Sequence, residues 1–163
     1  MKLLSTSASN TKIAKTQKKE KVQTRVASLS LYPDHIICAG SKAAKCMDGC
    51  LKSAGMGAFS NVKAGRKAKT DWFHADQDAF LAQLHKELYN FDKLCKRSGS
   101  IGQVRLNTIS DIAWEKLGVP QLFPDLSFYD YTKRVHRIGN TPANYKLMFS
   151  YSGARTYRKQ VEQ

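Results

Sequence analysis

The chain has 163 residues, a formal net charge of +14, and 42% hydrophobic residues. A chain of this length folds as one domain and can bury a core without disulfides or metals. It has no apolar run near the roughly 18 residues of a membrane span, and no apolar stretch like that of a signal peptide. We therefore expect a protein of the reducing cytoplasm with no membrane contact.

The positive charge is spread along the chain. It recurs in the opening residues, between Lys42 and Lys69, and between Lys133 and Lys159. A field of this sign attracts polyanions, so nucleic acid is the expected partner. A general contribution to solubility is the alternative.

The first half of the chain predicts an arm, a strand and helices. Residues 1–24 have the Lys-, Ser- and Thr-rich composition of a solvated basic arm, ahead of a single domain over residues 25–163. A buried strand is predicted over residues 25–33 and a helix over residues 42–55, which would place Cys46 and Cys50 one turn apart.

The segment over residues 55–70 is glycine-rich and basic, which predicts a loop or a weak helix. The clearest helix covers residues 76–97, where apolar residues recur every three or four positions. Strands are predicted over residues 102–108, 127–132 and 145–152, with a short helix over residues 110–118. This order indicates an α/β fold with a mainly parallel sheet.

Polar residues follow the predicted strands, where parallel sheets bind ligands. We predict catalytic roles for Asp111, Asp130 and Lys133. The predicted ligand-binding residues are Arg105, Asn107, Ser110, Tyr131 and Ser150.

Structural roles are the alternatives for the same side chains. Arg105 and Asp130 could form an ion pair between strands. Asn107 and Ser110 could serve a turn and a cap. Lys133 could be a surface cation.

Three of the four cysteines, Cys38, Cys46 and Cys50, lie within thirteen residues. Disulfides, buried apolar cysteines and a metal centre are the alternatives, and a reducing compartment disfavours disulfides. Zinc sites normally use paired, closely spaced ligands, which are absent from this sequence. Three thiolates suit a [4Fe–4S] cluster with one open iron. Cys95, on the apolar face of the long helix, is either a buried residue or a fourth ligand.

Enzymes that cleave S-adenosylmethionine place a three-cysteine loop directly after the first strand of a partial (β/α) barrel, and the cysteines here follow a predicted strand in the same way. Their usual spacing is three residues and then two, whereas here it is seven and then three. The difference bears more on S-adenosylmethionine, a candidate second cofactor, than on the cluster. We expect a partial (β/α) barrel-like sheet.

Five ordered motifs resemble the bacteriophage gene product 88 family: "LLSTSASNTKIAK", "CAGSKAAKCMDGCLKSAGMG", "VRLNTISDIAWE", "FYDYTKR" and "NYKLMFSYS". The resemblance implies a phage protein in the host cytoplasm, three cysteines that act as a unit, and an amino-terminal arm that packs on the domain. One difference is "NTISD", which lacks the glycine of the family's "NGTSD".

The leading hypothesis is a phage iron–sulfur protein that acts on or binds nucleic acid. An alternative is a non-catalytic basic protein that binds nucleic acid or inhibits a host enzyme, so that its partner is a host protein. A third is a small hydrolase or transferase that uses Asp111 and Asp130, although the sequence has no nucleophile elbow, P-loop or paired histidines.

Overall fold

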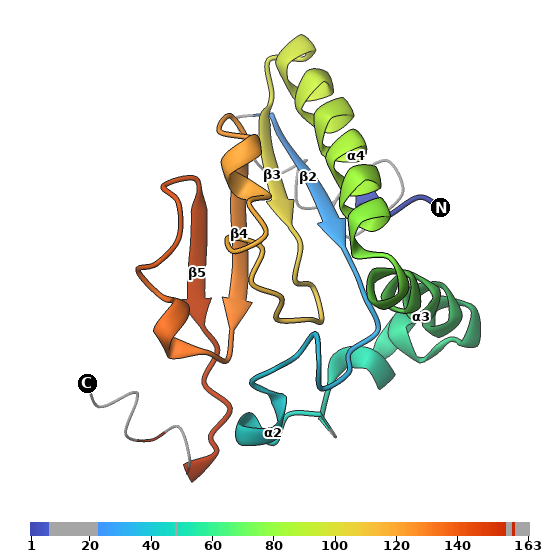
Figure 1. The fold of residues 1–163 in the computed structure, drawn as a ribbon, viewed down its shortest axis with the longest axis vertical. Coiled ribbons are helices and arrows are strands. Elements are labelled where there is room, and N and C mark those ends of the chain that lie inside the picture. The colour runs from blue at the N-terminus through green and yellow to red at the C-terminus, as the bar shows by residue number, and fades with distance from the viewer. Residues whose placement is uncertain (7–22, 48, 156–157, 159–163) are drawn as a thin grey trace.

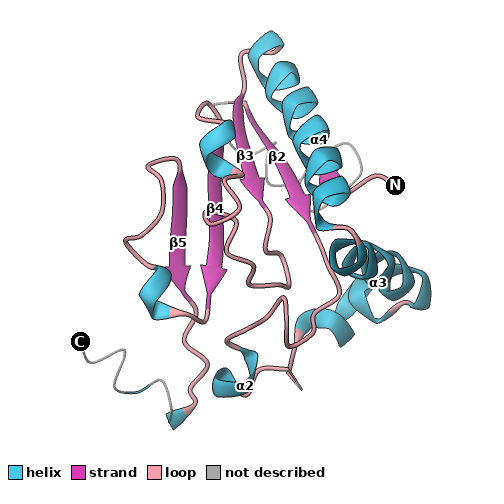
Figure 2. Ribbon diagram, in the orientation of Figure 1, coloured by secondary structure: helices cyan, strands magenta, loops and turns pink. Residues whose placement is uncertain are grey.

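The fold is a mainly parallel five-stranded sheet, with α4 lying alongside β2 and β3 (Figure 1). The computed structural model describes residues 1–6, 23–47, 49–155 and 158. The five strands lie side by side in chain order: β1 (Leu4–Thr6), β2 (Thr24–Leu29), β3 (Ile101–Arg105), β4 (Ser127–Thr132) and β5 (Tyr145–Phe149). The helical elements are α2 (Ser41–Ala44), η2 (Leu51–Ser53), η3 (Gly55–Ala58), α3 (Ser60–Ala75), α4 (Gln77–Arg97), η4 (Pro120–Leu122) and η5 (Val135–Arg137) (Figure 2).

The sheet has one antiparallel edge. β1 pairs antiparallel with β2, and the pairs β2–β3, β3–β4 and β4–β5 are all parallel. Parallel crossovers are right-handed, so strands in chain order carry their connections over the same face. The mainly parallel α/β sheet is confirmed, and the partial (β/α) barrel remains a prediction.

Helix α4 supplies the helical side of the core, as its periodicity predicts. It begins after Asp76, whose side chain accepts a hydrogen bond from Ala79 N at 2.9 Å. Its buried face packs in one cluster with strand residues such as Val104 and Phe128. Trp114, fully buried, joins this cluster and contacts the ring of Phe73.

The first residues of the chain are anchored to this core. Leu3 and Leu4 are buried, and both of their backbone N–H groups donate to the carboxylate of Glu87 on α4. The Lys69 ammonium donates to Leu3 O at 2.8 Å. Residues 1–6 therefore pack on the domain, in line with the family resemblance rather than with the solvated arm. The predicted arm over residues 7–22 lies outside the described residues.

Two predicted helices differ from the structure. α2 ends at Ala44 because Lys45 takes a left-handed conformation with φ 49°, so Cys46 and Cys50 lie outside any helix. Residues 114–119 form turns rather than a helix, and the side chains of Ser110 and Asp111 bond elsewhere instead of capping one.

Strand and helix boundaries also differ in places. β4 matches its predicted residues, whereas β2, β3 and β5 end before the predicted limits because the chain turns away at the polar edge of the sheet. The basic segment before α4 forms a regular helix, α3. Among the described residues, no helix combines the length and the apolar character needed to cross a membrane.

A glycine substitution tests the packing between α4 and the sheet. A Cβ at Gly102 would lie 2.5 Å from Leu126 Cδ2 and 3.0 Å from Cys95 Sγ. Gly102→Ala should therefore lower the free energy of unfolding by about 1–3 kcal/mol, measured by urea denaturation. Gly65→Ala is the control, because Gly65 is exposed on α3 with open space around its Cα. It should raise stability by up to about 1 kcal/mol. Equal effects at both sites would contradict this packing.

Candidate functional site

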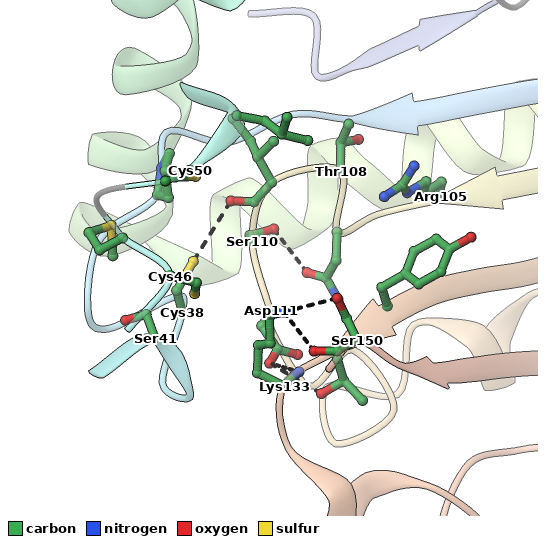
Figure 3. Close-up of a pocket in the computed structure, with 18 residues that line it drawn as sticks. Cys38, Ser41, Cys46, Cys50, Arg105, Thr108, Ser110, Asp111, Lys133 and Ser150 are labelled. Atoms are coloured by element: carbon green, nitrogen blue, oxygen red, sulfur yellow. Dashed lines mark hydrogen bonds between the residues drawn. The ribbon is translucent and has the colours of Figure 1, made fainter. Parts of the chain in front are cut away.

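A pocket of about 390 Å³ lies where the parallel strands end. Its lining comes from the loop after β2, from the segment after β3, and from the ends of β4 and β5. Figure 3 shows cysteines on one side of the pocket, with Arg105, Lys133 and Ser150 on the strand side. The pocket therefore occupies the edge at which the sequence predicts a ligand site.

The three clustered cysteines line this single pocket. Cys38 lies in the loop after β2, Cys46 follows α2, and Cys50 directly precedes η2. Cys38 Sγ donates to Ile109 O at 3.7 Å, which joins the cysteine loop to the segment after β3. Two of the cysteines thus reach the pocket from an irregular loop, and the predicted helical spacing of Cys46 and Cys50 is wrong.

The thiols influence one another. The pKa of Cys38 is raised to about 12, mainly by burial, with smaller contributions in the same direction from Cys50, Asp111 and Cys46. None of the four cysteines, all of which the structure describes, forms a disulfide. The cysteines that the sequence groups therefore also lie near one another in space.

Cys95 lies apart from this group. It is 3% exposed, belongs to the hydrophobic core, and would contact a Cβ at Gly102 near the beginning of β3. The pocket is at the other end of that strand. The suggestion that Cys95 supplies a fourth ligand is therefore wrong, and its alternative interpretation as a buried residue holds.

The strand side of the pocket carries two cations. The guanidinium of Arg105 lies over the ring of Tyr131, 5.1 Å from its centroid, and its Nε is buried without a hydrogen-bond partner. Lys133 Nζ donates to the backbone and side-chain oxygens of Ser150 at 2.6 and 2.9 Å. All four residues are predicted site residues, and the structure brings them together.

Asn107 holds together the turn after β3, which borders the strand side of the pocket. Its Oδ1 accepts from Ser110 Oγ and Ile112 N, both at 2.9 Å, and from Trp114 Nε1 at 3.1 Å. Its Nδ2 donates to Ile112 O. Asn107 and Ser110 line the pocket, but the polar side-chain atoms of Asn107 are committed to holding the turn. The interpretation as turn residues fits the contacts of both.

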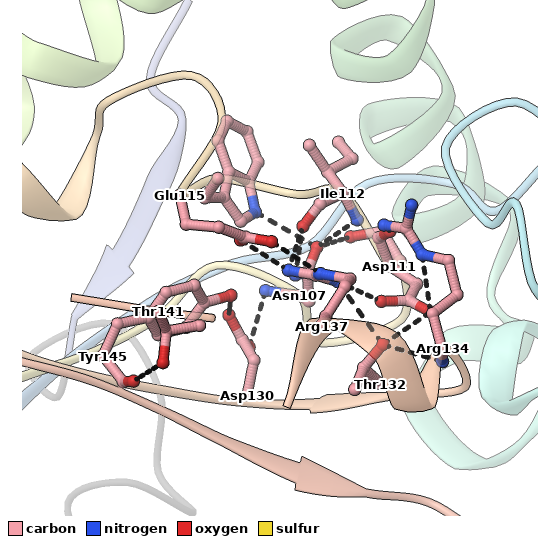
Figure 4. Close-up of polar contacts among 12 residues, drawn as sticks. Asn107, Asp111, Ile112, Glu115, Asp130, Thr132, Arg134, Arg137, Thr141 and Tyr145 are labelled. Atoms are coloured by element: carbon pink, nitrogen blue, oxygen red, sulfur yellow. Dashed lines mark hydrogen bonds and ion pairs between the residues drawn. The ribbon is translucent and has the colours of Figure 1, made fainter. Parts of the chain in front are cut away.

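Asp111 is the centre of a buried ion-pair network (Figure 4). Its Oδ1 pairs with Arg137, and its Oδ2 accepts from Thr132 Oγ1 at 3.1 Å and from Lys133 N at 3.0 Å. Arg137 is 2% exposed and also pairs with Glu115 at 2.7 Å. Asp111 is therefore paired with Arg137 and is placed to position the backbone of Lys133.

Asp130 does not line the pocket. Its carboxylate is fully buried, and it accepts from Asn107 N at 2.8 Å and from Tyr145 OH at 3.0 Å. The pKa of Asp130 is raised to about 7, because the effect of burial outweighs the lowering effect of these two donors and of Arg105. Arg105 Nε lies 4.0 Å away, so the alternative of a strand-to-strand ion pair is the better description. The predicted catalytic role of Asp130 lacks access to a ligand.

Sequence reasoning missed Arg137 and Glu115. Both lie in segments without a clear periodicity, and their partners are more than 20 residues away in the chain. The one available signal was the run of basic residues after β4, between Lys133 and Arg137. A run of this kind usually indicates a solvated surface.

The comparisons with known proteins give one result. Residues 2–163 match the family Gene product 88. The chain belongs to the Gene product 88 family. No curated protein and no solved structure matches the chain. The family resemblance inferred from five motifs is thereby confirmed over almost the whole chain, and with it the phage origin that it implies.

The described residues of this Gene product 88 chain do not form a site for a single metal ion. Within the described ranges, no three His, Cys, Asp or Glu side chains are grouped tightly enough to hold one metal ion. A [4Fe–4S] cluster binds each thiolate through a separate iron, so its ligands stand around a cavity rather than at one point. Cys38, Cys46 and Cys50 line one pocket, and their thiols are of the ligand type that such a cluster uses.

The titration of Asp130 gives a test of its burial. Its pKa of about 7 exceeds its ordinary value of 3.8, so the ionised carboxylate destabilises the fold. The contribution of Asp130 to the free energy of unfolding is therefore fully present below about pH 4 and is lost as the pH rises through about 7. Asp130→Asn should therefore gain stability relative to the natural chain between these pH values, measured by urea unfolding at each pH.

A second variant sharpens that experiment. Tyr145→Phe removes a donor to the same carboxylate and should make the loss of stability above about pH 6 steeper. If the free energies of unfolding of the natural chain and of Asp130→Asn changed with pH in the same way, burial would not raise the pKa of this carboxyl group.

Proposed function

We propose that Cys38, Cys46 and Cys50 hold a [4Fe–4S] cluster in the pocket at the carboxyl end of the sheet. The supporting observation is that three cysteines from separate parts of one loop line a single cavity. They also lie close enough for Cys46 and Cys50 to raise the pKa of Cys38. Cysteine thiolate is the usual ligand of such clusters.

The electrostatics of the three thiols favour a cationic occupant. Three neighbouring thiolates repel one another, and burial disfavours the charged form of Cys38. Iron binds the thiolate form, so binding should release protons and should weaken as the pH falls. A cluster bound by three cysteines supplies one open iron, which can bind a small molecule such as S-adenosylmethionine.

The other side of the pocket is suited to an anionic group on the substrate. Lys133 is held in place by Ser150 and by the bond from its own backbone N–H to Asp111. Arg105 is held by its contact with Tyr131. Arg137 compensates the charge of Asp111, so the ammonium of Lys133, whose hydrogen bonds go to the neutral oxygens of Ser150, remains to attract the ligand. Together with the net charge of +14, this favours a nucleic acid or a nucleotide as the substrate class.

Purification without oxygen tests this proposal. The natural chain should contain about four iron and four sulfide per molecule and show visible charge-transfer absorbance. Cys46→Ala should lose the absorbance and most of the iron, because two thiolates cannot retain the cluster. Cys95→Ala is the matched control and should keep both, because Cys95 lies in the core away from the pocket.

Two results would contradict the proposal. One is a colourless, iron-free chain that also fails to take up iron and sulfide under reducing conditions. The other is equal iron loss in Cys46→Ala and Cys95→Ala, with both variants folded by circular dichroism.

A non-catalytic role is the second candidate. Its motivating observation is the excess of positive charge, with exposed Lys42 and Lys45 on the cysteine loop at the pocket-bearing edge. Under this alternative the protein binds nucleic acid or inhibits a host enzyme without a cluster. Cys46→Ala would then leave partner binding unchanged, which separates the two candidates. A hydrolase using Asp111 and Asp130 is not proposed, because one carboxylate is paired with arginine and the other is buried.

A further inference from the structure

The two faces of the sheet differ in what covers them. On one face, strand residues such as Ala27, Val104 and Phe128 are fully buried in the cluster that includes α4 and Trp114. In Figure 1, α4 runs alongside β2 and β3. Every second residue of β2, β3, β4 and β5 points to the opposite face. These residues are half-buried or exposed, except for Thr24, which is buried. We call this second face the open face.

An open face is unusual for strands of this type. Parallel sheets are normally covered on both sides, so their strands are continuous apolar runs. Here β4 alternates instead: Phe128, Asp130 and Thr132 are buried, whereas Tyr129 is half-buried and Tyr131 is 43% exposed. This alternation indicates a face that is used in contact with solvent or with a ligand.

Cations and aromatic rings gather on the open face. Ser28 pairs with Arg105, and Tyr129 pairs with Lys146, in the strand register. Because Val104 pairs with Phe128, the next step of that register sets Arg105 across from Tyr129. The resulting row is Ser28, Arg105, Tyr129 and Lys146, across four strands and without an acidic residue.

The row nearer the pocket extends the same surface. Tyr131 pairs with Met148, and the Arg105 guanidinium lies over the Tyr131 ring. Arg105 and Tyr131 also line the pocket, so the open face and the pocket share a border. A chain lying on the face could therefore extend into the pocket.

We propose that the open face binds single-stranded nucleic acid. Exposed aromatic side chains on a sheet stack with unpaired bases, and cations beside them contact phosphates. Tyr129 and Tyr131 would carry the stacking, and Arg105 and Lys146 would contact the backbone. A duplex keeps the faces of its bases stacked inside, so it cannot use the tyrosines. The inference takes the nucleic-acid partner from the proposed function but does not depend on the cluster.

Fluorescence anisotropy with labelled oligonucleotides tests this surface. The probes are single-stranded DNA and RNA of about 12 nucleotides, within the site sizes of single-strand binders, and the matching DNA duplex. We expect tighter binding of at least one single strand than of the duplex, and affinity that falls as salt is raised. The comparison of DNA with RNA identifies which of the two is preferred.

Matched variants place binding on the open face. Tyr131→Ala should weaken single-strand binding by roughly five-fold or more, whereas Tyr89→Ala, which removes an exposed ring on α4, should not. Lys146→Gln should lower the slope of log affinity against log salt by about 0.7, the value for one phosphate contact in a single strand. Lys86→Gln, which removes an exposed charge on α4, should change the slope less.

Three outcomes would overturn the inference: equal affinity for duplex and single strands, equal effects of Tyr131→Ala and Tyr89→Ala, or binding that is insensitive to salt. The test is independent of the cluster. An iron-free preparation that prefers single strands in the predicted way supports the open face and contradicts the cluster alone. A cluster-loaded preparation without that preference contradicts the open face alone.

Discussion

The pocket depends on the buried polar network at the ends of β3 and β4. Asp111 pairs with Arg137 while its backbone N–H donates to Ile37 O at 2.9 Å, in the loop that carries Cys38. Asn107 fixes the turn just before it. One network therefore sets both the strand side of the pocket and the approach of the cysteine loop. Removing one partner of a buried ion pair costs about 3–5 kcal/mol, so the arrangement has little freedom to vary.

The division of the sheet into a core side and an open side explains how a small domain combines two surfaces, the pocket and the open face. The core takes the apolar side of every strand, and the connections between strands lie over that side. Cysteines, cations and tyrosines are left at the carboxyl edge and on the open face. Arg105 belongs to both surfaces, which joins a candidate cluster site to a candidate nucleic-acid site.

The sequence predicts the fold best where several local signals agree. α4 has a clear apolar period and a capping Asp76, and β4 is rich in the aromatic residues typical of strands. The cysteine loop was mispredicted because a left-handed Lys45 ends the helix where the local sequence favours its continuation. The role of Asp130 could not be assigned because the sequence of β4 has aromatic residues on both sides of the strand and does not reveal which side faces the core. Arg137 could not be found because its partners are set by tertiary contacts.

The central claim is that three thiolates converge on iron at the edge where the parallel strands end. The most direct measurement is a crystal structure of the anaerobic protein with anomalous scattering recorded at the iron edge. The account predicts anomalous density in the pocket, bounded by the sulfur atoms of Cys38, Cys46 and Cys50. An ordered cysteine loop with the three sulfur atoms directed apart, and no iron signal between them, would contradict it.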